Sequence, residues 1–288
     1  MTQETTAPTI DDLRDKDGKF SMLAIDQRES LRQMLASAAT IATVEDGALE
    51  AFKLSVVREL SPFASAVLLD HSYGSIAAKS SSCPVILAAD VLFQAAPGGP
   101  VNRAELDPLV TPELLTKLGA SALKMLVPWL PDQRAEAIAL SASFMDLCRK
   151  AGVPGIVEGV VRPDDLATWS EEKRNDALVL ATEDLAQTMP DLYKAEVPQY
   201  GGGDPDGIIK TAQRITDILD CPWVVLSSGV PAAIFPNAVA LSMRGGAGGF
   251  LAGRAIWADA ITAEDPQAFL RNESAGRMRD IASIARNN

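Results

Sequence analysis

Charged side chains lie inside apolar stretches of this 288-residue chain, where a charge is costly to bury unless it is paired. The clearest case is Lys194, in the stretch LYKAEVP. If this stretch is a strand, Lys194 and Glu196 lie on the same face, because side chains alternate between the two faces. The lysine can then form an ion pair with Glu196, which is a structural role. Held as a neutral amine, it can instead attack a carbonyl carbon and form a Schiff base.

Two more residues favour the Schiff-base interpretation of Lys194. Lys124 lies in the middle of ALKMLVPW, and Glu158 lies in the middle of GIVEGVVR. Desolvation and neighbouring cations lower the pKa of a lysine, which produces the neutral amine that carbonyl attack requires. The sequence therefore predicts covalent amine chemistry supported by a nearby carboxylate.

The composition argues against a metal or another cofactor. The chain has one histidine, His71, and three cysteines without C-x-x-C spacing. Transition-metal sites draw mainly on His and Cys, so a site built from several histidines is excluded. We expect no metal and no other cofactor. We expect Cys83, Cys148 and Cys221 to be buried free thiols in a reducing compartment.

Eight apolar stretches recur along the chain, and a helical pattern follows most of them. Their hydrophobicity is continuous rather than alternating, which is typical of parallel strands buried on both faces. We predict the α/β class and a single (β/α)8 barrel. An open doubly wound sheet is the alternative, but the first stretch ends in AIDQRES and has no Gly-rich turn. The predicted strands lie at 21–28, 65–72, 84–90, 122–129, 155–162, 192–198, 223–229 and 248–255.

No linker or change of composition divides the chain, so we predict one domain over 1–288, with 1–18 as a polar N-terminal extension. The link at 91–110 is long, and we expect it to overhang the mouth of the barrel.

Helix ends are marked by cap residues such as Thr111 and Ser170, and by glycines such as Gly119 and Gly152. Helices are predicted at 45–60, 112–118, 133–151, 170–187, 206–219, 235–244 and 265–286.

The active residues of a barrel enzyme lie at the carboxyl ends of its strands. Here these ends carry many ionisable and small residues within otherwise apolar stretches. They are Asp26, Gln27, Arg28, Asp70, Asp90, Lys124, Glu158, Lys194, Glu196, Ser227, Ser228, Gly229, Gly253 and Arg254.

The last two predicted strands end in LSSGV and LAGRAIW, which suit an anion site. Many barrels bind a phosphate there, because small residues let backbone N–H groups approach the anion. Arg254 adds a bidentate donor, although a Ser-Ser-Gly sequence by itself is an ordinary turn. Arg28 is a second candidate cation, with a salt bridge to Glu29 or Asp26 as its structural alternative. A sugar with an anionic group at each end would use Arg28 and Arg254 on opposite sides of the lysine.

Six segments, in this order along nearly the whole chain, resemble the class I aldolases of the tagatose-1,6-bisphosphate aldolase type. The similarity is greatest to the sulfofructosephosphate aldolases. The segments are FSMLAIDQRESLRQML, ALKMLVPW, VEGVVRP, DLYKAEVPQYG, PWVVLSSGV and GGFLAGRAIW.

The resemblance implies roles for the residues of the reacting centre. Lys194 would form an imine with a ketose carbonyl. Glu158 would transfer protons during dehydration of the carbinolamine, and Lys124 would support the site electrostatically. Asp26 would take the hydroxyl proton as the C3–C4 bond breaks. A protonated imine is the electron sink that such a cleavage needs.

The resemblance also implies which residues hold the two ends of the substrate. One set would hold the phosphate of the dihydroxyacetone half, namely Ser228, Gly229, Gly253 and Arg254. Gln27 and Arg28 would face the other end, where a sulfonate is expected. The implied reaction converts 6-deoxy-6-sulfofructose 1-phosphate to dihydroxyacetone phosphate and sulfolactaldehyde. Unphosphorylated sulfofructose and tagatose 1,6-bisphosphate are the alternative substrates.

One segment departs from the sulfofructosephosphate pattern. DHSYGSIAAKSSS is shorter and more like the tagatose enzymes, so His71 and Ser72 could alter the distal pocket. Two other functional classes stay open. One is a phosphosugar isomerase with Glu158 as its base, and the other is a non-catalytic sugar-phosphate-binding barrel.

The net charge of −12 disfavours nucleic acid and anionic membranes as partners. The chain starts with a polar stretch and has no apolar run of about 18 residues, so we expect a cytoplasmic protein and no membrane partner.

We expect a homo-oligomer, although the helix at 265–286 can use its apolar residues for association or for packing on the barrel. These residues are Phe269, Leu270, Met278, Ile281 and Ile284.

Overall fold

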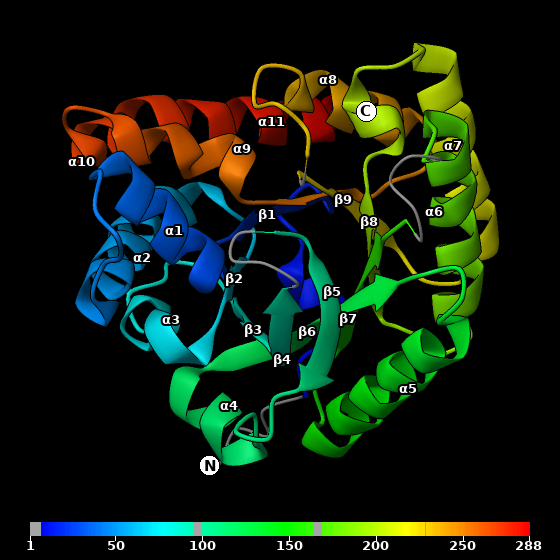
Figure 1. Ribbon diagram of the computed structural model, residues 1–288, viewed down its shortest axis with the longest axis horizontal. Helices are drawn as coiled ribbons and strands as arrows, with labels where there is room; N and C mark the ends of the chain where they lie inside the picture. Colours follow the sequence, from blue (N-terminus) through cyan, green and yellow to red (C-terminus); the bar gives the residue numbers. More distant parts are fainter. Residues whose placement is uncertain (1–6, 95–98, 164–168, 228) are drawn as a thin grey trace.

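Eight parallel strands close into a barrel in the computed structural model, which describes residues 7–94, 99–163, 169–227 and 229–288 (Figure 1). Around the barrel the strands follow the order β1, β10, β9, β8, β7, β6, β3, β2. The predicted (β/α)8 fold is therefore confirmed. The strands are β1 (Phe20–Ala24), β2 (Val67–Leu69), β3 (Val85–Ala88), β6 (Ala120–Trp129), β7 (Gly155–Val161), β8 (Leu192–Glu196), β9 (Trp223–Leu226) and β10 (Gly249–Ala252).

Helices surround the barrel on its outside (Figure 1). Their apolar faces pack against the outward side chains of the strands in one continuous core, as both faces of a parallel sheet must be covered. The helices are α1 (Glu29–Ala38), α2 (Asp46–Leu60), α3 (His71–Ala78), α4 (Pro112–Leu118), α5 (Arg134–Ala151), α6 (Glu171–Ala186), α7 (Pro205–Ile218), α8 (Phe235–Arg244), α9 (Arg254–Trp257), α10 (Pro266–Phe269) and α11 (Ala275–Asn287).

A second, smaller apolar cluster fills the inside of the barrel. Its members come from alternate strand positions, such as Phe20, Met22 and Ala24 of β1, because only every second side chain points inward. Leu13 is fully buried in the same cluster, at the end of a 3₁₀ turn (Ile10–Leu13). Part of the expected N-terminal extension thus packs against the inside of the barrel. The reason is Leu13, an apolar side chain among polar neighbours, which is buried in that inner cluster.

The helix ends follow the local signals of the sequence. The side chain of Thr111 accepts a hydrogen bond from the backbone N–H of Leu114, and that of Ser170 accepts one from Lys173. Gly119 and Gly152 end their helices in the left-handed conformation, with φ of 65° and 67°. This conformation costs glycine little, because it has no Cβ.

The link after β3 contains structure that the sequence analysis did not predict. β4 (Asp90–Gln94) and β5 (Val101–Leu106) form an antiparallel hairpin, which lies in front of β6 in Figure 1. The guanidinium of Arg103 stacks on the ring of Phe93 across the two strands, 3.7 Å from its centroid. Such cross-strand pairs stabilise a hairpin, and they depend on pairing that a single stretch of sequence does not reveal.

The C-terminal segment is helical, as expected, but a π-helical turn (Leu270–Ser274) joins α10 to α11. Leu270, Met278 and Ile281 are buried within the chain, so these residues pack on the barrel. No helix among the described residues is both long and apolar enough to cross a membrane.

Candidate active site

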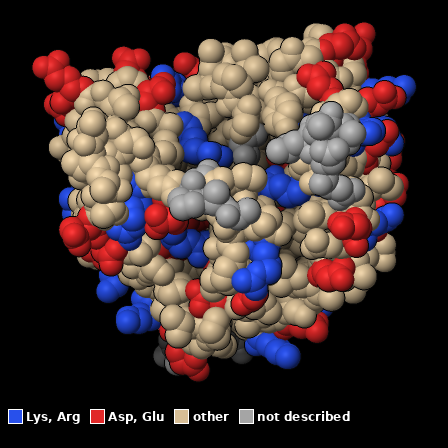
Figure 2. Space-filling model, in the orientation of Figure 1, with Lys and Arg blue, Asp and Glu red and all other residues tan. Residues whose placement is uncertain are grey.

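A cavity of about 520 Å³ opens at the carboxyl ends of the barrel strands. Figure 2 shows Lys and Arg atoms inside the hollow at the centre of this face, whereas Asp and Glu atoms lie mainly around its edge. The structure brings the predicted site residues together in this cavity. Its lining includes Asp26, Gln27, Arg28, Lys124, Glu158, Lys194, Gly229, Gly253 and Arg254. The predicted Ser228 lies outside the described residues.

Strand periodicity explains why these side chains meet. Apolar residues of the inner cluster, such as Ala122, Ile156 and Leu192, point into the barrel. The next inward position on each strand lies two residues later and nearer the carboxyl end. On β6, β7 and β8 these positions are Lys124, Glu158 and Lys194. An apolar layer therefore lies directly below a layer of charged side chains.

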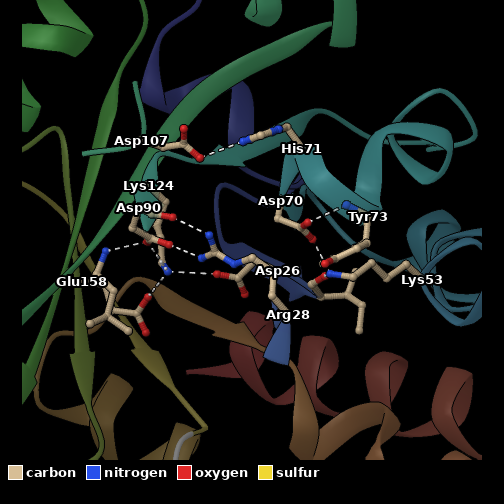
Figure 3. Close-up of polar contacts among 12 residues, drawn as sticks. Asp26, Arg28, Lys53, Asp70, His71, Tyr73, Asp90, Asp107, Lys124 and Glu158 are labelled. Carbon is tan, nitrogen blue, oxygen red and sulfur yellow. Dashed lines mark hydrogen bonds and ion pairs between the residues drawn. The ribbon is translucent and has the colours of Figure 1, made fainter. Parts of the chain in front are cut away.

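Lys124 is the centre of this charged layer. Its Nζ lies 2.9 Å from Asp26 Oδ2, 3.2 Å from Asp90 Oδ2 and 2.8 Å from Glu158 Oε2 (Figure 3). Burial alone would lower the pKa of Lys124, but the three carboxylates outweigh it and raise the pKa well above its usual value. This favours the charged ammonium form of Lys124, which neutralises the carboxylates around it.

The pKa of Asp26 shifts in the opposite direction, because its neighbours are cations. Burial by itself would raise its pKa, but the positive charges of Lys124 and Lys194 hold the pKa well below the usual value. The carboxylate is therefore ionised at neutral pH, which is the form that can accept a proton.

Lys194 does not form the ion pair with Glu196 that was its structural alternative. Its Nζ lies 3.0 Å from Glu158 Oε1, so one carboxylate bridges Lys194 and Lys124. Glu196 is bound elsewhere, because it accepts a hydrogen bond of 2.9 Å from the backbone N–H of Val161 and pairs with Arg174 at 3.3 Å. Lys194 is only 4% exposed, and the exposed part faces the cavity.

Asp90 has a larger part in the site than its position after an apolar stretch indicated. It is fully buried, and it accepts hydrogen bonds from Lys124, from the guanidinium of Arg28 and from the backbone N–H of Leu126. Neither alternative partner predicted for Arg28, Glu29 or Asp26, forms its salt bridge. Burial would lower the pKa of Arg28, but the charge of Asp90 outweighs this and raises it.

The turns after β9 and β10 form the wall beside Lys194. Gly229 has a φ of 74°, and a Cβ there would lie 3.0 Å from the ring of Tyr200. At Gly253 a Cβ would lie 2.5 Å from the carbonyl oxygen of Ala24, and the backbone N–H of Gly253 points to Ser227 Oγ at 3.4 Å. Only glycine fits these two positions, so the wall here is formed by backbone.

Three cavity or near-cavity residues were missed by the sequence analysis, namely Arg162, Arg174 and Tyr200. Arg162 and Tyr200 line the cavity, and the guanidinium of Arg174 stacks on the Tyr200 ring at 3.7 Å. Arg162 ends the stretch GIVEGVVR, two inward positions beyond Glu158, so strand alternation was a usable signal. Nothing in the sequence indicated Tyr200, whose placement depends on positive φ angles at Gln199 and Tyr200.

Two strand-end residues lie away from the cavity. Asp70 follows β2, but it caps α3 at the N–H of Tyr73 and pairs with the buried Lys53 of α2 (Figure 3). His71 contacts Asp107, with 2.7 Å between Nε2 and Oδ2, and does not line the cavity. The expected effect of His71 on the distal pocket is therefore not a direct contact with the cavity.

Comparison with known proteins now identifies the family. A model of the DeoC/LacD family aldolases matches residues 20–259. A tagatose 1,6-diphosphate aldolase of Staphylococcus haemolyticus (strain JCSC1435) is 30% identical over 285 residues, which cover 88% of this chain and 85% of the relative. The tagatose 1,6-diphosphate aldolase of Listeria monocytogenes serotype 4a (strain HCC23) is 28% identical over 274 residues, covering 86% and 80%.

Solved structures agree on the fold. An archaeal fructose 1,6-bisphosphate aldolase superposes with a TM-score of 0.66 at 17% identity, covering 96% of this chain and 97% of the other. A fructose-bisphosphate aldolase from Plasmodium falciparum superposes with a TM-score of 0.71 at 14% identity, covering 96% and 92%. The chain belongs to the DeoC/LacD family of aldolases, and it is a class I aldolase, a carbon–carbon lyase.

Proposed function

We propose that the enzyme cleaves 6-deoxy-6-sulfofructose 1-phosphate to dihydroxyacetone phosphate and sulfolactaldehyde, through an imine on Lys194. The observation that carries the mechanism is the difference between the two buried lysines. Lys124 is surrounded by three carboxylates, whereas Lys194 pairs only with Glu158 among the described residues. Lys194 is therefore the amine that can give up its proton and attack a carbonyl carbon.

Glu158 is placed to move the protons of imine formation. Its Oε1 lies 3.0 Å from Lys194 Nζ, within reach of the amine and of the carbinolamine hydroxyl that forms on it. In this mechanism Glu158 removes a proton from the Lys194 ammonium and later protonates the departing hydroxyl as water. Its Oε2 remains beside the Lys124 ammonium, which stabilises the carboxylate between these transfers.

Asp26 is the proposed base for cleavage of the C3–C4 bond. It is held ionised, and it removes the proton from the C4 hydroxyl while the electrons of the C3–C4 bond move into the imine. The aldehyde leaves and an enamine remains on Lys194. Protonation of the enamine carbon and hydrolysis of the imine release dihydroxyacetone phosphate and regenerate the amine.

We assign the phosphate of the dihydroxyacetone half to the wall formed by Gly229, Gly253 and Arg254, together with Ser228. The two glycines support this assignment, because they leave backbone without side chains beside Lys194. Arg254 lines the same wall and can donate two parallel hydrogen bonds to an anion.

We assign the hydroxyl groups of the departing half of the sugar to the side of the cavity that carries Gln27 and Arg28. The Oε1 of Gln27 is buried without a hydrogen-bond partner among the described residues, so it can accept a bond from a substrate hydroxyl.

A sulfonate at C6 is the distal group proposed from the sequence resemblance. Tagatose 1,6-bisphosphate is the second candidate substrate, favoured by the tagatose 1,6-diphosphate aldolases among the relatives. Unphosphorylated sulfofructose is the third. Membership of an aldolase family favours cleavage over the isomerase and the non-catalytic barrel.

Borohydride trapping tests the proposal. The enzyme is treated with sodium borohydride in the presence of sulfofructose 1-phosphate, sulfofructose or tagatose 1,6-bisphosphate, and the intact mass and the modified peptide are determined. We expect a stable adduct on Lys194, with the fastest cleavage for sulfofructose 1-phosphate. The variant Lys194→Met should give no adduct, while the exposed control Lys117→Met should behave as the wild type. Binding of these ketoses without an adduct would overturn the imine mechanism, and faster cleavage of tagatose 1,6-bisphosphate would overturn the substrate.

We also propose that the enzyme works in the cytoplasm as a homo-oligomer. Three free thiols suit a reducing compartment, and burial raises the pKa of Cys83 to about 11, so its thiol stays protonated. Exposed apolar side chains, such as Ile76 and Leu109, offer area for association. Light scattering should give a multiple of the chain mass of 30.5 kDa.

A further inference from the structure

Arg162 is a cation at the cavity for which the proposed chemistry has no use. It follows β7 directly and lies two inward positions beyond Glu158, which places it nearer the mouth of the barrel. Its side chain is half-buried and forms part of the cavity wall. Its positive charge therefore has no role in the imine chemistry.

Two nitrogens of the Arg162 guanidinium donate to backbone carbonyl oxygens. Nε donates to that of Val101 at 2.7 Å, and Nη1 donates to that of Val161 at 2.9 Å. These two bonds fix the plane of the guanidinium. Within the described part of the chain Nη2 has no acceptor, so it can donate to a ligand.

Arg162 also differs from three other cations of the cavity in having no ion-pair partner among the described residues. Lys124, Lys194 and Arg28 each contact a carboxylate. Arg162 forms no ion pair with any residue that the structure describes, and carbonyl oxygens do not neutralise its charge. Burial lowers the pKa of Arg162, and the charges of Glu196 and Glu158 only partly offset this, because neither carboxylate forms an ion pair with it.

The charges of the cavity are nearly balanced, whereas the chain carries a net charge of −12. Among the described residues that line the cavity, five are cations and four are carboxylates, and the buried Asp90, which pairs with Arg28 and Lys124, is a fifth carboxylate of the site. The site therefore repels an anion less than the rest of the protein does, and a cation without an ion pair can select one. The cations are Arg28, Lys124, Arg162, Lys194 and Arg254, and the carboxylates are Asp26, Glu29, Glu158 and Glu196.

Arg28 is poorly suited to bind the anion at the distal end of the substrate. Its guanidinium donates to both the side chain and the backbone carbonyl of Asp90, so its charge is already neutralised. Arg162 lies on the opposite wall, because β1 and β7 are four strands apart in the closed ring of eight. The two arginines therefore define different directions for the distal end of a substrate.

We propose that Arg162 binds the second anionic group of the ketose, so that the specific substrate is a ketose 1-phosphate with a sulfonate or phosphate at its far end. The geometry that carries this is a guanidinium in the cavity wall that donates to two backbone carbonyls and forms no ion pair with any residue that the structure describes. The proposal rests on the proposed aldolase reaction and assigns its distal specificity to β7 rather than to Arg28.

A purely structural role makes a different prediction. The bond from Arg162 to Val101 also ties β7 to the β4–β5 hairpin, and loss of that tie would impair every substrate alike. The variant Arg162→Gln keeps an amide donor but removes the charge. Arg162→Lys keeps the charge but loses the planar fork. Arg214→Gln removes a charge from an exposed position of α7, where Arg214 pairs with Asp176, and serves as the matched control.

The experiment compares two substrates that differ only at the far end, sulfofructose 1-phosphate and fructose 1-phosphate. For Arg162→Gln we expect kcat/KM for sulfofructose 1-phosphate to fall by roughly 10- to 100-fold, the value of hydrogen bonds to a charged group. The value for fructose 1-phosphate should change by less than about threefold. Arg162→Lys should recover part of the loss, and Arg214→Gln should match the wild type. Affinities of the same compounds, measured by calorimetry, should show the same difference.

Three results would overturn the proposal. They are an equal loss on both substrates, no loss on either, or a distal preference that is abolished by Arg28→Met and kept in Arg162→Gln. Borohydride trapping with dihydroxyacetone phosphate distinguishes failure of the Arg162 proposal from failure of the proposed aldolase reaction, because that compound forms the imine but has no distal group. Every Arg162 variant should still be trapped at Lys194. If the wild type is not trapped and cleaves neither ketose, the calorimetric comparison still decides whether Arg162 binds the distal anion.

Discussion

Two buried lysines of similar exposure, 1% for Lys124 and 4% for Lys194, have different neighbours, and we propose different chemical roles for them on that ground. Three carboxylates keep Lys124 charged, and its charge keeps Asp26 ionised. Glu158 contacts both lysines, so it can take a proton from one while the other stabilises it. At this scale, function follows from the number of charges around each amine rather than from burial.

Asp26→Asn separates cleavage from imine formation. The amide has nearly the same shape but cannot accept the C4 hydroxyl proton, so kcat for ketose cleavage should fall by about 10²- to 10⁴-fold. Trapping of dihydroxyacetone phosphate on Lys194 should persist, because this compound has no C4 hydroxyl. Asp206→Asn, at an exposed position in α7, is the control. Loss of trapping in step with cleavage would show that Asp26 is not specific to the bond-breaking step.

Lys124→Met should give a pH-dependent loss of stability. Three carboxylates lose their shared cation, and breaking such a buried arrangement costs about 3–5 kcal/mol in the free energy of unfolding. In the wild type, the lowered pKa of Asp26 means that its contribution is present at and above its ordinary pKa near 4 and is lost only as the pH falls further.

In the variant the pKa values of Asp26 and Asp90 rise, because the cation that lowers them is gone, so these carboxylates take up protons in mild acid and their repulsion is relieved. Urea unfolding should therefore show a larger difference from the wild type at pH 7.5 than at pH 5. A difference that is the same at both pH values would indicate lost packing rather than lost charge.

At the scale of elements, short turns and one hairpin complete a site whose charged residues come from the strands. The turn after β9 requires a positive φ at Gly229, and the ring of Tyr200 lies directly beside it. The β4–β5 hairpin supplies Val101, which holds the guanidinium of Arg162. Helix ends, by contrast, use local caps such as Thr111 that serve stability away from the cavity.

Gly229→Ala tests the glycine wall. The new Cβ would lie 3.0 Å from the Tyr200 ring in a conformation that L-residues rarely adopt, so the turn must shift. We expect KM for phosphorylated ketoses to rise on the order of tenfold, while trapping at Lys194 persists at saturating substrate. The matched control is Gly152→Ala, which has a similar φ of 67° but open space around its Cβ. It should lower stability by about 1 kcal/mol without changing KM. An equal KM for both variants would remove Gly229 from the phosphate site.

At the scale of the whole molecule, closure of the barrel makes every strand depend on two neighbours. β1 pairs with β10, so the first and last strands of the chain close the ring. The N-terminal Leu13 and the C-terminal Met278 are both buried in the structure. We therefore expect the predicted single domain to unfold as one unit.

Urea unfolding should show one cooperative transition. Circular dichroism reports the helices, and fluorescence reports buried tryptophans such as Trp129, Trp223 and Trp257, which lie at different points around the barrel. The two signals should have the same midpoint. Separate midpoints would show that the chain contains two folding units and would contradict the single domain.

The sequence by itself determined the barrel and most of the charged layer. Continuous apolar stretches reported strands buried on both faces, and the charged residues within them, such as Lys124, Glu158 and Lys194, were predicted to belong to one active site. These signals are local, because they depend on neighbours one or two residues away along the chain. The cap residues of the helices were readable for the same reason.

Only the tertiary structure decided which charges meet. Lys194 pairs with Glu158 of the neighbouring strand and not with Glu196, and Arg28 pairs with Asp90, which is 62 residues away. Arg162 depends on a hairpin that forms by pairing across a turn. Such contacts are set by strand order and register around the closed ring, which bring distant residues within hydrogen-bond reach. No local pattern of residue types carries that information.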